Sequence, residues 1–498
     1  MLMICDLKRC VQALLLPVLI SASLPTITSA NPETGIIVSA KERNLANLKS
    51  LLDESVDVNA ADSDGTTALH WAVHWDDREI AGLLLASGAV VDQANLYGLT
   101  PLWLACTNRS TEMINLLLKA GASPNAKLST GETVLVNCAR TGSVDAVQAL
   151  LGSVTEIDVN ARESKKGQTA LMWAAAGGHA MIVKSLLDYG ARLDIASNGG
   201  FTPLLFAARS GDIETARILL DADADLDEAT AEQGNSLVIA SAGGHEDLAL
   251  LFLQEGADPH SVDENGLTAL HHSVREGLSL LNGVIYDKAY RLPVSNMPKL
   301  TRALLEAGAK PDVQISQAKL LGPDGIPFDM VGATPFLLAA LSADVSLMRL
   351  LKDFGADAQL ATRDGVTPLM AAAQAACTGT CAFQDMVDVV GRKDAEVAKE
   401  AVRMIVEEIG TDLEAVNQLG RTAVHFAAFI GSDAVVKYLA EQGAMLDVRD
   451  KNGETPWTMA SGISPKANTR GAYRESVSTS ELLAKLGAKT VADFTGGK

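Results

Sequence analysis

The same pattern of apolar and polar positions returns along this chain, in most cases after 33 residues. The run Gly65-Thr66-Thr67-Ala68-Leu69-His70-Trp71-Ala72 returns as Gly98-Leu99-Thr100-Pro101-Leu102-Trp103-Leu104-Ala105. A short constant period predicts a stack of one small unit rather than a globule with a single core. Related runs begin at Gly131, Gly167, Gly200, Gln233, Gly266, Gly332, Gly365, Gly420 and Gly453.

The pattern within one period predicts two short helices. Threonine before proline, as at Thr202-Pro203 and Thr334-Pro335, supplies an N-cap hydroxyl and a first helical residue that needs no N–H. The first helix contains small residues such as Ala174-Ala175-Ala176, which allow neighbouring helices to approach closely. The second helix carries leucines and ends at glycine, as at Gly88, because a helix C-cap favours the left-handed conformation. Asp223 stands where one such glycine is expected.

The repeated unit resembles the ankyrin repeat. Gly200-Phe201-Thr202-Pro203-Leu204 matches its first half, and Leu116-Leu117-Leu118-Lys119-Ala120-Gly121-Ala122 matches its second half. The resemblance covers about Asn31 to Lys489. It implies an all-α ankyrin-repeat solenoid of about 12 stacked helix-turn-helix units, with hairpin-like loops and no true sheet.

We therefore expect a single solenoid over residues 31–490 and a tail over residues 491–498. Three insertions interrupt the period, near residues 278–296, 315–327 and 377–398. Long loops on a rigid scaffold are commonly functional, so these insertions are candidates for partner specificity, with uneventful surface loops as the alternative. The solenoid divides into an N-terminal capping repeat (31–64), repeats (65–452) and a C-terminal capping repeat (453–490).

The N-terminal segment, residues 1–30, has the pattern of a cleavable secretory signal peptide. Lys8 and Arg9 precede a mostly apolar run over residues 11–24, and Thr28-Ser29-Ala30 supplies small residues for cleavage. The run is short for a membrane span, and an uncleaved anchor is the alternative. We expect the mature chain to be periplasmic or secreted and not inserted in a membrane, as in the long exported bacterial ankyrin proteins that it resembles.

Four cysteines follow the predicted signal peptide. Cys106 and Cys138 occupy first-helix positions, where we expect small core residues. Cys377 and Cys381 open an insertion and are candidates for a local disulfide in an oxidising compartment. Two free thiols or half of a metal site are the alternatives for this second pair.

Charge and motifs argue against several function classes. The net charge of −20 disfavours nucleic acid as a partner. The sequence contains no His-Glu-x-x-His zinc motif, no Gly-x-Ser-x-Gly nucleophile motif, no Walker loop and no dinucleotide-binding fingerprint. We therefore expect no enzyme, no cofactor and no metal site. The acidic run from Asp221 to Asp227 has calcium-loop spacing with Glu232, but Leu226 replaces the required glycine, and we expect solvated carboxylates. The resemblance implies structural roles for His70, His271 and His425 in the motif and for His179 and His245 in Gly-His turns.

The resemblance also implies a binding surface on a concave face of first helices and hairpin tips. Arg140, Arg209 and Arg275 share one repeat position, so we expect them to line one groove and to grip acidic groups of a partner. The alternative is that each arginine pairs with a neighbouring carboxylate and only holds the stack. We expect Trp75, Phe201 and Phe429 to be exposed contact residues, and Trp71 and Trp173 to be core residues. The candidate partner-binding residues are His74, Trp75, Tyr97, Arg140, Phe201, Arg209, Arg275 and Phe429.

Taken together, these features predict a non-catalytic, monomeric scaffold that binds a partner protein in the periplasm or outside the cell. A preorganised groove lowers the entropy cost of binding. Two alternatives remain: an accessory or stabilising subunit of an exported redox enzyme, and a secreted effector that targets host proteins.

Overall fold

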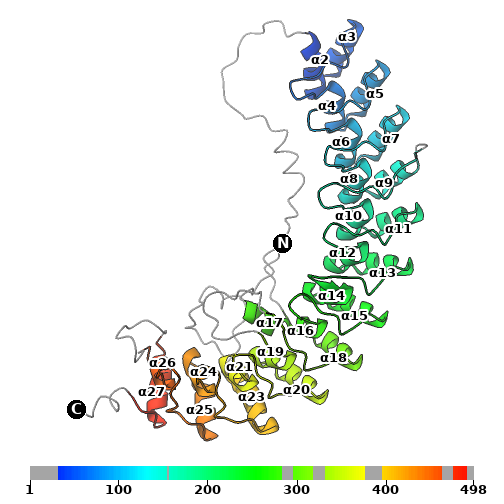
Figure 1. Ribbon diagram of the computed structural model, residues 1–498. Helices are drawn as coiled ribbons and strands as arrows, with labels where there is room; N and C mark the ends of the chain where they lie inside the picture. The colour runs from blue at the N-terminus through cyan, green and yellow to red at the C-terminus, as the bar shows by residue number, and fades with distance from the viewer. Residues whose placement is uncertain are drawn as a thin grey trace, which may run out of the picture. The chain divides into compact units, whose positions relative to one another are not determined.

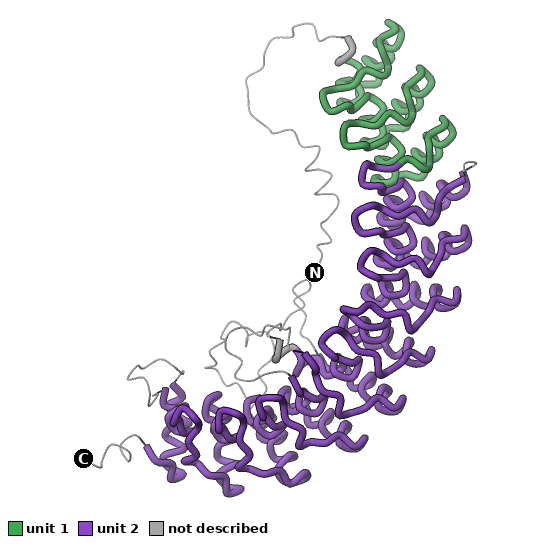
Figure 2. Tube along the Cα trace, in the orientation of Figure 1, with its two compact units in different colours: residues 1–126 green, residues 127–498 purple. Residues whose placement is uncertain are grey.

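The computed structural model describes residues 32–153, 156–282, 295–317, 331–375, 395–462 and 475–490. These residues form two compact units, one within residues 1–126 and one within residues 127–498, shown in different colours in Figure 2. Within the described residues the helices form twelve pairs, so the expected all-α solenoid of about twelve units is confirmed. The predicted signal peptide, the tail from 491 and both Cys377 and Cys381 lie outside the described residues.

The N-terminal unit contains three of the helix pairs. Its first helices stack on one another and each packs against its own second helix (Figure 1). The helices are α2 (Pro32–Lys41), α3 (Leu45–Asp53), α4 (Ala68–His74), α5 (Arg78–Ala86), α6 (Pro101–Asn108) and α7 (Thr111–Lys119).

The C-terminal unit contains the other nine pairs, again with the first helices in one layer and the second helices in another (Figure 1). The first helices are α8 (Val134–Thr141), α10 (Ala170–Ala176), α12 (Pro203–Ser210), α14 (Ser236–Gly243), α16 (Ala269–Ser273), α19 (Pro335–Leu341), α21 (Pro368–Gln374), α24 (Ala423–Ile430) and α26 (Pro456–Ala460). The second helices are α9 (Val144–Leu151), α11 (Ala180–Asp188), α13 (Ile213–Asp221), α15 (Glu246–Gln254), α18 (Pro298–Glu306), α20 (Val345–Asp353), α23 (Ala395–Arg403), α25 (Asp433–Glu441) and α27 (Val477–Lys485).

Three further elements depart from this plan. A π-helix, η1 (Met404–Ile409), continues α23. The strands β1 (Ala229–Thr230) and β2 (Gly234–Asn235) form one short antiparallel hairpin. An extra helix, α17 (Arg275–Asn282), lies between α16 and α18 and packs against α19. Residues 283–294, 318–327 and 377–394 of the expected insertions lie outside the described residues.

Helix ends follow the expected capping chemistry. The Thr100 hydroxyl accepts a hydrogen bond from the Trp103 N–H at 3.3 Å, and Pro101 occupies the first turn. Glycines close the second helices with positive φ, as at Gly88 with φ 91°. A Cβ at Gly88 would meet nothing within 4 Å, so conformation and not space favours glycine there. Asp223 adopts the same left-handed conformation, with φ 63°, in place of glycine.

The core consists mainly of alanine and leucine side chains. Ala72 and Leu84 are fully buried in the N-terminal unit, as are Ala174 and Leu186 in the C-terminal unit. Small residues on the first helices allow close stacking, and each repeat therefore buries its apolar faces against its neighbours.

Buried histidines tie successive hairpins together. His70 accepts the Thr67 N–H at Nδ1 (3.1 Å) and donates from Nε2 to the Leu99 carbonyl (2.9 Å). His425 accepts the Thr422 N–H at 3.0 Å, and its Nε2 lies 3.4 Å from the Glu454 carbonyl oxygen. The expected structural role of these motif histidines is confirmed. Their neutral form is required, because Nδ1 must accept.

Candidate functional site

The face formed by the first helices and the hairpin tips, which we call the first-helix face, carries the predicted binding residues. The position nine residues after each repeat glycine lies in or just after the last turn of the first helix. It is occupied by His74 in the N-terminal unit and by Arg140, Arg209 and Phe429 in the C-terminal unit.

In the N-terminal unit, the end of α4 forms an aromatic cluster. The His74 ring packs edge-on against Trp71 and Trp75, with centroid distances of 5.7 and 4.8 Å. Trp75 remains 46% exposed, as expected for a contact residue. Burial against these rings lowers the pKa of His74, which favours a neutral imidazole near pH 7.

A hairpin tip presents a second exposed aromatic side chain. Tyr97 is 54% exposed, and the tip from Asn95 to Leu99 is held by its own hydrogen bonds. The Asn95 Oδ1 accepts the N–H groups of Tyr97 and Leu99, each at 3.0 Å. The neighbouring Leu96 is 78% exposed. An ordered turn thus displays two large apolar side chains to solvent.

A small cavity of about 20 Å³ lies on this unit, between the aromatic cluster and the base of the hairpin. Trp71, His74, Asn95 and Leu99 contribute to its wall. Its volume admits a group the size of one water molecule. The indole Nε1 of Trp71 is buried and has no hydrogen-bond partner among the described residues. Trp71 is therefore largely a core residue, as expected.

In the C-terminal unit, Arg140 is neutralised within its own repeat. Its Nη1 lies 2.6 Å from the Glu132 Oε1, and its Nη2 donates to the Asn137 Oδ1 at 3.1 Å. The guanidinium also lies 5.3 Å from the centroid of the Trp173 ring. Burial raises the pKa of Glu132, an effect that the charge of Arg140 opposes. Arg140 therefore pairs with a neighbouring carboxylate, as in the alternative in which such an arginine only stabilises the stack of repeats.

Arg209 differs from Arg140. Its guanidinium lies 4.9 Å from the ring centroids of both Phe201 and Phe206, and no described carboxylate is within ion-pair distance. Burial against the rings lowers the pKa of Arg209, although the side chain remains exposed. The equivalent positions in the adjacent repeats are Ala176 and Ala242, which are too small to cover it. Arg209 is a rigidly held cation that faces solvent.

The expectation that Phe201 is exposed is wrong. Only 8% of its surface is accessible, because the ring packs at 5.3 Å from Phe206 beneath the Arg209 guanidinium. Phe201 supports Arg209 and offers little contact area of its own. Phe429, at the end of α24, is partly exposed.

Arg275 lies at the start of α17 and crosses the backbone at Gly244. A Cβ on Gly244 would lie 1.3 Å from its Nη1. Burial lowers the pKa of the adjacent His245, and the charge of Arg275 lowers it further, whereas a hydrogen bond to the Arg209 carbonyl raises it. The His245 Nε2 lies 3.3 Å from that carbonyl oxygen. The three arginines therefore have three different environments.

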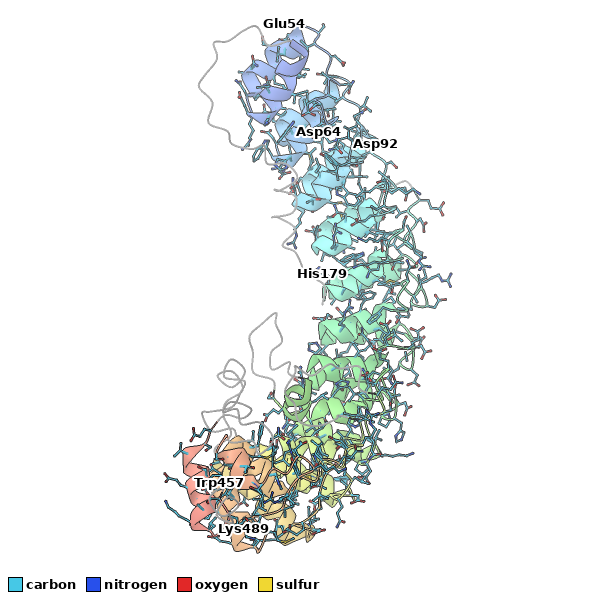
Figure 3. All side chains as sticks on the ribbon, turned by 60° about the vertical axis from the view of Figure 1, so that its left-hand side comes forward. Glu54, Asp64, Asp92, His179, Trp457 and Lys489 are labelled. Atoms are coloured by element: carbon cyan, nitrogen blue, oxygen red, sulfur yellow. The ribbon has the colours of Figure 1, made fainter. Side chains whose placement is uncertain are left out.

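Histidines of the Gly-His turns fill space between repeats. His179, labelled in Figure 3, lies so close to Gly142 that a Cβ there would be 2.6 Å from its Cε1. His245 approaches Gly211 in the same way, at 2.4 Å from its Nδ1. These contacts require glycine at the end of the preceding first helix.

The cysteines require a correction. Cys106 and Cys138 are fully buried, as expected of small core residues, but both are disulfide-bonded rather than free. The candidate disulfide between Cys377 and Cys381 lies outside the described residues. Buried disulfides are typical of proteins that fold in oxidising compartments.

Sequence reasoning missed Lys41, which belongs to the N-terminal aromatic cluster. Its Nζ lies 4.9 Å from the centroid of the Trp71 ring. Lys41 lies 33 residues before His74, at the equivalent position of the preceding repeat. The repeat period could therefore have identified it. Sequence reasoning also missed Glu132 as the partner of Arg140.

The described residues contain no group of three or more His, Cys, Asp or Glu side chains that could hold a metal ion. No helix in the described ranges is both long enough and apolar enough to span a bilayer.

Comparison with protein families gives matches to ankyrin repeats along most of the chain. A model of three ankyrin repeats matches residues 2–95, 89–163, 154–230 and 392–464, and a model of many ankyrin repeats matches residues 237–280.

Individual relatives match only part of the chain. The B-cell lymphoma 3 protein homolog of Mus musculus is 34% identical over 134 residues, which are 26% of this chain and 30% of that protein. Neurogenic locus notch homolog protein 1 of Xenopus laevis is 34% identical over 154 residues, 31% of this chain and 6% of that protein. This chain spans less than a third of the length of either relative.

Two solved ankyrin repeat domains match part of the chain. That of Bcl-3 matches with a TM-score of 0.38 and 28% identity, covering 42% of this chain and 94% of the domain. That of human ASB11 matches with a TM-score of 0.40 and 27% identity, covering 45% of this chain and 98% of the domain.

Proposed function

Because the chain belongs to the ankyrin-repeat family, we propose that it is a non-catalytic scaffold that binds a partner protein on its first-helix face. Repeats of this kind are interaction scaffolds, and the described surface offers exposed aromatic and cationic side chains.

The environment of Arg209 is the observation that carries this proposal. Two phenylalanine rings fix the guanidinium, which lowers the entropy lost when it binds. Arginine pairs with carboxylates through two parallel hydrogen bonds, and no described carboxylate occupies that role. An exposed, preorganised and unpaired cation is suited to an acidic group of a partner.

Arg140 provides a matched control for a test of this proposal. It occupies the same repeat position, but Glu132 already satisfies it. We would capture partners from the native cell envelope with the wild-type chain, Arg209→Met and Arg140→Met. Loss of the captured protein with Arg209→Met and its retention with Arg140→Met are expected. Equal recovery by all three forms would contradict the role of Arg209, and recovery of nothing by the wild type would contradict the scaffold.

We further propose that the scaffold is exported and works in the periplasm or outside the cell as a monomer. The signal-like pattern over residues 1–30 and the disulfide-bonded Cys106 and Cys138 support this location. Mass spectrometry of the protein from native cells tests it. The expected result is a mature N-terminus near residue 31, and an intact Met1 with only free thiols would contradict export.

A further inference from the structure

The hairpin tip before α10, residues 162–167, carries three cations and is called the lysine tip below. Lys165 is exposed, Lys166 is partly exposed, and Arg162 is exposed at the base of the tip. None of the three forms an ion pair with a carboxylate among the described residues. Other tips of the C-terminal unit have acidic residues where this tip has its lysines: Glu232, Glu264 and Asp364.

The acidic side chain of the lysine tip is bonded to the backbone. Glu163 is only 9% exposed. Its Oε2 accepts the Lys165 N–H at 2.7 Å, and its Oε1 accepts the N–H groups of Lys166 at 2.7 Å and Gln168 at 3.2 Å. Glu163 therefore fixes the path of the tip from the inside, while the lysine ammonium groups keep their donors for solvent or a partner.

The next repeat holds the lysine tip in place. The Asn198 N–H donates to the Lys166 carbonyl at 2.7 Å, and its Nδ2 donates to the Lys165 carbonyl at 3.2 Å. Arg162 donates from Nη2 to the Asn198 Oδ1 at 3.2 Å and from Nε to the Gly167 carbonyl at 3.0 Å. These acceptors of Arg162 are neutral, so the bonds order the tip without cancelling its charge.

Asn198 also connects the lysine tip to Arg209. It belongs to a turn that the Gly200 N–H closes by donating to the Ser197 carbonyl at 2.9 Å, and Phe201 follows directly. The Phe201 ring lies 4.9 Å below the Arg209 guanidinium. Three residues span at most about 10 Å, so one short segment of a partner can contact both the lysine tip and Arg209.

We propose that Lys165, Lys166 and Arg209 bind an extended acidic segment of the partner protein, in which carboxylate side chains lie two to four residues apart. Side chains on one face of an extended segment are separated by about 7 Å for every two residues, which matches the distance to be covered. The proposal rests on the proposed scaffold function and specifies the chemistry of its partner.

Charge complementarity favours a short acidic segment over a longer polyanion. The cations of this surface are ordered and unpaired, so they attract carboxylates and fix their register. The chain as a whole has a net charge of −20, which repels nucleic acid over longer distances.

A peptide of defined composition tests the proposal without knowledge of the partner. We would measure binding of the full chain, by fluorescence anisotropy at low salt, to a labelled peptide of alternating glutamate and threonine. Its counterpart has glutamine in place of glutamate. We expect the glutamate peptide to bind at least roughly tenfold more tightly, and this preference to shrink as salt is added.

Matched variants locate the binding surface. Joint substitution Lys165→Gln and Lys166→Gln is expected to weaken binding of the glutamate peptide roughly tenfold, and Arg209→Met roughly fivefold. The control is joint substitution Lys184→Gln and Arg217→Gln, which removes two charges from exposed positions on the second helices α11 and α13. It should leave the affinity for the glutamate peptide unchanged.

Several outcomes would overturn the proposal. These are equal affinity for the two peptides, equal weakening by the lysine-tip and control variants, and tighter binding of an oligothymidylate than of the glutamate peptide. Capture of the native partner distinguishes this failure from that of the scaffold. If the lysine-tip variant still captures the partner and Arg209→Met does not, the scaffold function stands and the role of the lysine tip is refuted.

Discussion

Removal of the Arg421 side-chain charge is expected to unfold the C-terminal repeats locally. Arg421 is 9% exposed and donates from Nε to the Asp450 Oδ2 at 3.0 Å and from Nη2 to the Glu454 Oε2 at 3.2 Å. Both carboxylates are buried, with side-chain exposures of 0% and 5%. The substitution Arg421→Met keeps much of the side-chain volume but leaves these two acids without their cation.

The structure sets the size of the effect. The Asp450 Oδ1 accepts the N–H groups of Asn452 at 2.8 Å and Glu454 at 2.9 Å, so its carboxylate cannot leave the site without opening the hairpin. Removal of one partner from a buried ion pair typically costs about 3–5 kcal/mol. Because repeats of a solenoid are stabilised by their neighbours, this loss should fall mainly on α24 to α27.

Hydrogen exchange measured by mass spectrometry resolves this loss along the chain. For amides in α24–α27 that exchange through opening of these repeats, a cost of about 3 kcal/mol or more predicts at least about 100-fold faster exchange. Lys437→Met is the control, because Lys437 forms an exposed pair with Glu441 at 3.9 Å that should contribute under about 0.5 kcal/mol. Acceleration below tenfold, or equal acceleration in residues 32–126, would refute the reasoning.

Three further predictions concern pH, backbone conformation and oxidation. Burial lowers the pKa of His271 and of His425 to about 4, below the unfolded value of 6.5. The stabilisation by these neutral histidines is therefore complete above pH 6.5 and is lost as the pH falls toward 4. Between pH 7.5 and 4.5, denaturant titrations should show a loss of unfolding free energy that is about 2–3 kcal/mol smaller in His425→Gln than in the wild type. An equal loss in both proteins contradicts this. Asp223→Gly should stabilise the chain by about 0.5–1 kcal/mol in a urea titration, because the residue has φ 63°; any loss of stability contradicts the backbone argument. Alkylation of the unfolded, unreduced chain should leave Cys106 and Cys138 unmodified, and labelling of either contradicts the disulfide assignment.

The repeat fold can be predicted from sequence because its determinants are local. A threonine cap such as Thr100, a proline at the next position and a closing glycine such as Gly88 fix each helix pair within a single repeat. Even the exception at Asp223 can be located in the sequence, because the repeat period identifies it as the position of a closing glycine. Asp223 adopts the left-handed conformation that glycine has at the equivalent positions.

The candidate site is less predictable because its properties depend on distances between side chains. The sequence places Arg140 and Arg209 at equivalent positions, but it cannot show that Glu132 reaches Arg140 and that Arg209 lies over two phenylalanine rings. The pattern puts Phe201 on the surface because nothing in it shows that an arginine covers the ring. Oxidation of Cys106 and the unpaired indole N–H of Trp71 are likewise properties of geometry.

The central claim is that a partner protein binds the first-helix face, and a footprint of the captured partner tests it most directly. Hydrogen exchange of the full chain would be compared with and without that partner bound. The account predicts slower exchange at the hairpin tips and the ends of the first helices, including Tyr97 and Arg209, with little change in the second helices. Protection confined to second helices such as α13 and α15 would contradict it.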